Sequence, residues 1–132
     1  MLKIRVGVLE QHAIVRYGLC KHVAGQPQLA LAGVYNNAEG ILDSVRQDRL
    51  DVLLVGHLID QDPSQCVEAL SQKYPRLKIL ALLNHPHAVA TSLLLARGAH
   101  GVLYKTQPLQ AYAEAILAVG RGERYCEYTG LS

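Results

Sequence analysis

The sequence predicts an α/β fold built on a single doubly wound sheet of five parallel strands. Short apolar runs alternate five times with segments of helical periodicity, and no long polar stretch separates them. Most of the runs are apolar throughout, which is typical of strands in parallel sheets that helices cover on both faces. Because crossovers between parallel strands are right-handed, this alternation folds into an open sheet with its ligand crevice at the carboxyl ends of the strands.

The expected strands are residues 2–9, 29–35, 51–55, 78–83 and 101–104. In the second helical segment, we expect Asn37 to cap a helix whose inward stripe consists of Ala38, Ile41, Leu42 and Val45.

The later helices have their own start and stop signals. Pro63 suits the first turn of the third helix, which continues inward with Val67, Leu70 and Tyr74. Pro108 precedes the fifth helix, whose periodic apolar residues are Leu109, Tyr112, Ala113, Ile116 and Leu117. The first, fourth and fifth helices are expected to stop at Gly25, Gly98 and Gly122.

Composition excludes several classes of protein. The chain has 132 residues, of which 50% are hydrophobic and 18% charged, so it has the size and core of one soluble domain. No apolar run approaches the roughly eighteen residues of a membrane span. The net charge of +2 is too small for nucleic-acid binding through this domain. Three cysteines without metal-ligand spacing favour a reducing compartment, the cytoplasm.

Enzyme motifs are absent as well. The sequence contains no GxGxxG, GxxxxGK[ST], GxSxG or HExxH motif. Dinucleotide binding, P-loop hydrolysis and the hydrolase and zinc-protease mechanisms therefore have no support. We expect no enzymatic activity, no cofactor and no metal.

Four stretches carry a resemblance to a known family: VGVLEQHAIVRYGL (6–19), DVLLVGH (51–57), LLARGAHGVLYK (94–105) and LQAYAEAILAVGRGERY (109–125). With this spacing the chain resembles the receiver domains of response regulators, in particular those of the NarL/FixJ subfamily, over nearly its whole length. The resemblance implies the flavodoxin-like (βα)5 fold with strand order 2-1-3-4-5. It also implies a receiver-like domain of residues 1–122, with residues 123–132 as a tail or the start of a linker.

Receiver domains transfer a phosphoryl group to an aspartate at the end of the third strand. The resemblance implies two acids that help to hold Mg²⁺, and a hydroxyl and a lysine that contact the phosphoryl oxygens. This sequence departs from the pattern: the acidic pair is Glu10 and Gln11, the acceptor position is Gly56, and the hydroxyl position is Leu83. Lys105 matches the family lysine. Val102 stands three residues before that lysine, where the family often has an aromatic switch residue.

Because glycine has no nucleophile, the sequence predicts a degenerate receiver, a pseudo-receiver without phosphotransfer chemistry. Freed of a phosphoryl partner, Lys105 is expected to pair with Glu10, with anion binding by Lys105 as the alternative. The domain is then a protein-interaction and dimerisation module. The resemblance implies the N-terminal regulatory part of a LuxR-type transcription regulator, with a C-terminal helix-turn-helix domain in the full-length chain.

Two other functions remain open at this stage. Asp60 or Asp62 could replace the missing phosphate acceptor. Alternatively, a small-molecule, metal or pH sensor could use the crevice vacated at Gly56, with contacts from Lys105 or from the crevice histidines His12, His57, His85 and His87.

The candidate dimerisation surface lies on the fourth helix, residues 88–97. Its three consecutive leucines, 93–95, turn through about 200°, so at least one must point away from the sheet. We expect Leu93, flanked by Val89 and Ala96, to form an apolar centre for a homodimer. The alternative surface combines the first and fifth helices, with Tyr112 and a small-residue side made of Ala111, Ala115 and Ala118.

Overall fold

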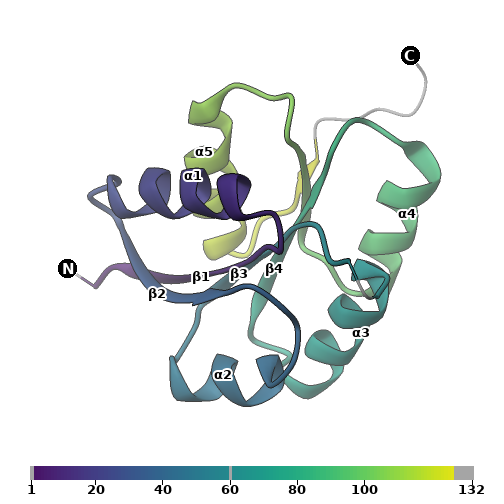
Figure 1. Cartoon of the computed structure of the whole chain (residues 1–132), viewed down its shortest axis with the longest axis horizontal. Coiled ribbons are helices and arrows are strands. Elements are labelled where there is room, and N and C mark those ends of the chain that lie inside the picture. The colour runs from purple at the N-terminus through teal and green to yellow at the C-terminus, as the bar shows by residue number, and fades with distance from the viewer. Residues whose placement is uncertain (1, 60, 127–132) are drawn as a thin grey trace.

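A computed structural model describes residues 2–59 and 61–126, which form a parallel sheet with helices on both faces (Figure 1). The longest helices have 12 residues, and no helix in this described part is long and apolar enough to cross a membrane. The elements in chain order are β1 (Ile4–Leu9), α1 (Ala13–Ala24), β2 (Leu29–Tyr35), α2 (Ile41–Gln47), β3 (Val52–Val55), α3 (Pro63–Lys73), β4 (Lys78–Leu83), α4 (Ala88–Arg97), β5 (Gly101–Tyr104), α5 (Leu109–Gly120) and β6 (Tyr125–Cys126).

The sheet has the order β2-β1-β3-β4-β5-β6, and every neighbouring pair is parallel. The flavodoxin-like α/β fold with a parallel sheet is therefore confirmed, but the prediction of five strands is wrong. Tyr125 and Cys126 pair with Gly101 and Val102 and add β6 beyond β5. A two-residue strand is too short to produce an apolar pattern, and its partner, the edge of β5, exists only in the folded sheet.

The apolar strands are buried on both faces because successive side chains point to opposite sides of a sheet. In β3, Leu53 and Val55 pack in one apolar cluster with α2, α3 and α4. Val52 and Leu54 pack in the other cluster with α1 and α5. All four side chains are fully buried. The continuous apolar runs therefore explain why helices cover both faces of the sheet.

The second helix begins later than the sequence predicts. It starts at Ile41, after Gly40 with φ 74°, and not after Asn37. The side chain of Asn37 instead accepts a hydrogen bond from the backbone N–H of Glu39 at 2.9 Å and stabilises a turn before the helix. The capping prediction is wrong because an asparagine side chain serves a local turn as well as a helix terminus.

The fifth helix is rotated relative to the predicted stripe. Its buried residues are Ala111, Tyr112, Ala115, Ile116, Ala118 and Val119, whereas Leu109 is 61% exposed. The prediction of a small-residue dimer surface on this helix is also wrong, because Ala115 is 0% exposed and belongs to the apolar core. The helix is apolar on most sides, so periodicity alone does not define its inward face; its small alanines face the sheet.

The fourth helix has the expected orientation. Leu94 is buried and Leu93 is 38% exposed, so the prediction of an outward leucine is confirmed. Val89, one turn earlier, is 73% exposed, and Ala96 is also exposed. These three residues are called the α4 patch below.

Replacing Gly98, which ends α4, by alanine is expected to destabilise the domain. Its φ of 121° disfavours any side chain, and a Cβ there would lie 2.3 Å from the Ser71 hydroxyl oxygen on α3. We expect Gly98→Ala to lower the free energy of unfolding by roughly 1–3 kcal/mol in urea titrations. The matched control is Gly18→Ala inside α1, where a Cβ meets nothing within 4 Å. Gly18→Ala should raise stability by roughly 0.5–1 kcal/mol; equal effects at both positions would contradict this account.

Candidate functional site

The residues at the family's phosphorylation positions meet at the carboxyl ends of the central strands. Glu10 follows β1, Gly56 follows β3 and Lys105 follows β5. The backbone N–H of Gly56 donates to the Leu9 carbonyl at 2.8 Å, and that of Lys105 donates to the Leu83 carbonyl at 2.8 Å. The sheet register therefore brings these positions together, as predicted.

The Glu10 carboxylate is the centre of this site. Its side chain is fully buried. Oε2 accepts a hydrogen bond from the backbone N–H of His12 at 2.8 Å. Oε1 accepts one from the backbone N–H of His57 at 3.0 Å and a second from Lys105 Nζ at 3.0 Å. The predicted pairing of Lys105 with Glu10 is confirmed.

The hydrogen bonds keep this buried acid ionised. Burial by itself raises the pKa of Glu10, but the two backbone N–H donors and the Lys105 ammonium outweigh it and hold the pKa below its ordinary value of 4.5. Lys105 is itself mostly buried, with 16% of its side chain exposed. The site is thus a buried ion pair at neutral pH, in which each charge needs the other.

Gly56 does not leave an open crevice. A Cβ built on Gly56 would lie 2.2 Å from Glu10 Oε1 and 3.0 Å from Glu10 Cδ. The Glu10 carboxylate therefore occupies the space that a side chain at position 56 would need. The expectation of a vacated crevice is wrong, because the glutamate that follows β1 reaches one bond further than an aspartate and fills the space.

The side chains present do not fit the Mg²⁺ of the family. Both Glu10 oxygens already accept hydrogen bonds, one of them from a cation. Gln11 replaces the second acid, and its side-chain oxygen accepts from the backbone N–H of Ile59. Gly56 supplies no ligand, and hard divalent cations require several free oxygen ligands. Within residues 2–59 and 61–126, no group of three or more His, Cys, Asp or Glu side chains could hold a metal ion.

The crevice histidines separate into two groups. The rings of His12 and His57 stack with centroids 4.3 Å apart and planes 10° apart, beside the Glu10 carboxylate. His87 lies instead at the start of α4, where its Nδ1 accepts from the backbone N–H of Ala90 at 3.1 Å, and His85 is exposed in the preceding loop. The four imidazoles do not converge on one point.

The structure describes one of the two acids that could replace the missing phosphate acceptor. Asp62 caps α3: its carboxylate accepts from the backbone N–H of Ser64 at 3.0 Å and from the Ser64 hydroxyl at 2.8 Å. Asp60 lies outside the described residues. The contacts of Asp62 are those of a helix N-cap.

A buried tyrosine next to the site was missed by sequence reasoning. Val102, at the family's aromatic switch position, is fully buried, and Tyr104 lies on the same face of β5 with 3% exposure. The Tyr104 hydroxyl lies 3.3 Å from the buried Thr91 hydroxyl on α4. The sequence contained a signal for this residue. Tyr104 directly precedes Lys105, and because side chains two residues apart in a strand share a face, it lies on the same face as Val102.

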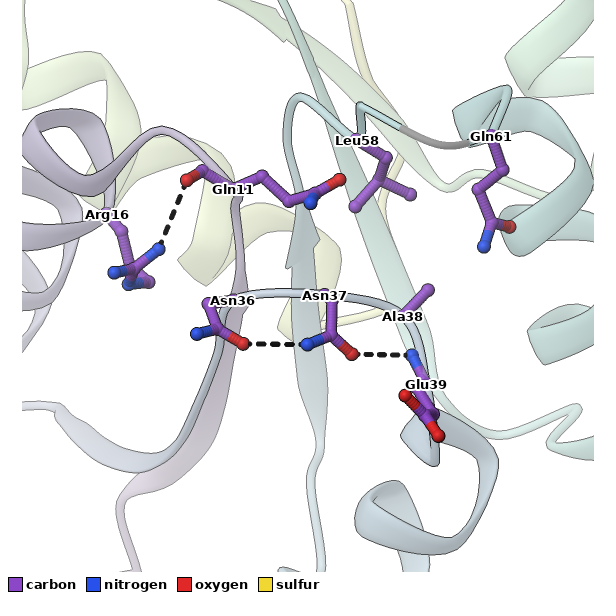
Figure 2. A pocket seen from close by; sticks show the side chains of 8 residues that line it. All are labelled: Gln11, Arg16, Asn36, Asn37, Ala38, Glu39, Leu58 and Gln61. Atoms are coloured by element: carbon purple, nitrogen blue, oxygen red, sulfur yellow. Dashed lines mark hydrogen bonds between the residues drawn. The ribbon is translucent and has the colours of Figure 1, made fainter.

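A polar pocket lies beside the ion pair, over the carboxyl ends of β1, β2 and β3. Figure 2 shows Gln11, Leu58 and Gln61 on one side of this pocket and the loop of residues 36–39 on the other. The loops that follow β1, β2 and β3 thus line one cavity. Its lining residues are Gln11, Arg16, Asn36, Asn37, Ala38, Glu39, Leu58 and Gln61.

Comparison with curated proteins finds transcriptional response regulators. The transcriptional regulatory protein DegU of Brevibacillus brevis is 29% identical over 126 residues, which cover 93% of this chain and 52% of DegU. The response regulator GacA of Pseudomonas viridiflava is 28% identical over 92% of this chain and 58% of GacA. The chain spans about half the length of the curated relatives it matches. No protein-family model matches the chain.

Solved structures with the same fold include a LuxR-family two-component response regulator from Aurantimonas sp. SI85-9A1. It superposes with a TM-score of 0.87 at 20% identity, over 93% of this chain and 89% of that one. This likeness shows that both chains share one fold.

Neutralising Glu10 is expected to destabilise the domain. Glu10→Gln leaves the mostly buried Lys105 charge unpaired, so the free energy of unfolding should fall by about 3 kcal/mol at pH 7. The exposed Glu114→Gln on α5 is the control and should change it by less than about 0.5 kcal/mol.

The same pair predicts a pH dependence. Because folding lowers the pKa of Glu10 below 4.5, its contribution to stability is present above that pH and is lost as the pH falls further. Wild-type stability should therefore decline more steeply below about pH 5 than that of Glu10→Gln. Parallel pH profiles in urea unfolding would contradict the ion pair.

Proposed function

We propose that this chain, which its relatives and fold support as a response-regulator receiver domain of the NarL/LuxR family, works without phosphorylation as a protein-interaction and dimerisation module. One observation carries the proposal. The acceptor position is a glycine with no room for a side chain, and the Glu10 carboxylate occupies that room and pairs with Lys105. Lys105, the lysine that contacts the phosphoryl oxygens in the family, is thus held by the Glu10 carboxylate without phosphorylation.

A permanent ion pair supports a single resting conformation. A ligand or modification shifts a conformational equilibrium only by its differential affinity for the two states. Here the lysine is already bound, and the contact between Tyr104 and Thr91 joins β5 to α4 in the core. With no phosphoryl group to gain or lose, the site has no covalent switch.

The α4 patch is the proposed contact surface. Val89 and Leu93 are exposed by 73% and 38%, and lie one turn apart on α4. An apolar surface that is always present would drive association without a modification step. We propose that two copies of the chain associate through this patch.

The proposed context is a cytoplasmic transcription regulator. The curated relatives are named as transcriptional or response regulators and are nearly twice as long as the matched region. We propose that the chain is the regulatory part of such a protein, with a DNA-binding helix-turn-helix domain elsewhere in the full-length chain and no nucleic-acid contact through this domain.

Incubation with acetyl phosphate should leave the intact mass unchanged, because position 56 offers no acceptor oxygen. Gly56→Asp alone should also stay unreactive, since Glu10 fills the required space and Gln11 leaves the metal site incomplete. The sharper variant combines Gly56→Asp with Glu10→Asp and Gln11→Asp, which shortens the blocking side chain and restores the acidic pair. We expect phosphorylation in this triple variant alone; a stoichiometric phosphoryl adduct on the wild type would refute the proposal.

Sedimentation should detect a dimer of the wild-type domain at tens of micromolar, a range usual for weak association. Leu93→Glu places a charge in the α4 patch and should weaken the dimer at least tenfold. Ile14→Glu, at the 79% exposed position on α1, is the matched control and tests the alternative surface on the first helix. A monomeric wild type, or weakening by Ile14→Glu but not by Leu93→Glu, would refute the α4 dimer.

A further inference from the structure

The pocket of Figure 2 has the size and position of a small-molecule site. Its volume is about 590 Å³, within the roughly 300–1,000 Å³ of ligand pockets. It lies at the carboxyl ends of β1, β2 and β3, where doubly wound sheets bind their ligands. Neither Glu10 nor Lys105 lines it. The pocket is therefore separate from the ion pair.

Two opposite charges stand at the ends of this pocket. Figure 2 places Arg16 and Glu39 apart, with Asn36 and Asn37 between them. Arg16 uses Nη1 to donate to the backbone carbonyls of Glu10 and Gln11 at 2.9 and 3.3 Å, which fixes the guanidinium and leaves its other N–H groups for a ligand. The Glu39 carboxylate makes no hydrogen bond or ion pair with any residue of 2–59 or 61–126.

Carboxamides line the space between the charges. Asn37 donates to the side-chain oxygen of Asn36 at 2.9 Å and accepts from the backbone N–H of Glu39, so both amides are oriented. The Asn36 NH₂ group and the Gln61 amide have no hydrogen-bond partner among the described residues. Such groups bind peptide-like N–H and C=O groups as both donors and acceptors.

An apolar extension leads away from the polar end. A second cavity of about 400 Å³ between α2 and α3 shares Ala38 and Gln61 with the first. Its lining includes two accessible apolar side chains, the half-buried Leu42 on α2 and the exposed Ala69 on α3. A ligand that crosses Ala38 would therefore find apolar surface beyond it.

We propose that this pocket binds a zwitterionic dipeptide or tripeptide with an apolar side chain. The ligand carboxylate pairs with Arg16, the ligand ammonium pairs with Glu39, and the amides of Asn36 and Gln61 contact the polar backbone of the ligand. The apolar side chain lies over Ala38 toward the groove between α2 and α3. This inference goes beyond the proposed function and does not depend on it.

The charge pattern selects this ligand class over others. A phosphate or nucleotide would place negative charge beside the Glu39 carboxylate, and like charges repel at this range. A neutral sugar would leave both charges without a counter-ion. A zwitterion satisfies both ends of the pocket at once.

The test is calorimetric titration of the full chain with L-alanyl-L-leucine and L-alanyl-L-alanyl-L-leucine. Each is compared with its N-acetylated form, which lacks the ammonium, and with its C-terminal amide, which lacks the carboxylate. We expect saturable binding of at least one zwitterion and a loss of about tenfold in affinity on blocking either charge. No saturable binding of either zwitterion would overturn the proposal, as would equal binding of the blocked forms.

Variants locate the site. Glu39→Gln should weaken zwitterion binding about tenfold and leave binding of the N-acetylated form unchanged. Arg16→Gln should also weaken zwitterion binding about tenfold, and it should leave binding of the C-terminal amide unchanged. Glu114→Gln and Arg76→Gln, both at exposed positions away from the pocket, are the matched controls and should bind as the wild type does.

Amide chemical shifts provide a second measurement that does not depend on the folding of Arg16→Gln. On addition of the binding zwitterion, the largest shifts should fall on Gln11 and on residues 36–39. Shifts concentrated on α4 or around Lys105 would overturn the proposal, as would undiminished affinity in Glu39→Gln.

Discussion

The hydrogen-bonded ion pair of Glu10 and Lys105 holds together the carboxyl-terminal edge of the sheet. It joins the end of β1 to the end of β5, two positions 95 residues apart in the chain. The same carboxylate receives the backbone N–H groups of His12 and His57, so the loops after β1 and β3 depend on it too. A buried charge with this many donors is stable where an unpaired one would cost several kcal/mol.

The ion pair also shows that the fold and the chemistry of a domain can vary independently. The chain has the α/β fold of the receiver structures that it superposes on, and Lys105 after β5 pairs with the carboxylate of Glu10 after β1. A fold can retain its packing and lose a reaction, because the reaction depends on a few groups whose replacements need only to fit. Glu10 fits because Gly56 has no side chain.

The position at which α2 begins determines which residues line the pocket at the same edge of the sheet. Because Asn37 stabilises a turn and α2 begins only at Ile41, residues 36–39 remain outside the helix and line the polar pocket. A helix starting at Asn37 would have drawn Glu39 and Ala38 into its first turn. The late start of α2 thus places a carboxylate and two amides opposite Gln11 and Gln61 (Figure 2).

The sequence by itself determined the alternation of strands and helices, the burial of the strands and the absence of a side chain at position 56. These features follow from local periodicity and from the identity of single residues such as Gly56, which no tertiary contact can change. The pairing of Glu10 with Lys105 was also predictable, since both lie at strand ends that parallel pairing brings to one edge. The tertiary structure decided the inward face of α5, the two-residue β6 and the filling of the space above Gly56. Each of these depends on how side chains from distant segments pack together: Ala115 against the sheet, Tyr125 beside Gly101, and the extra length of Glu10 over a glycine 46 residues later.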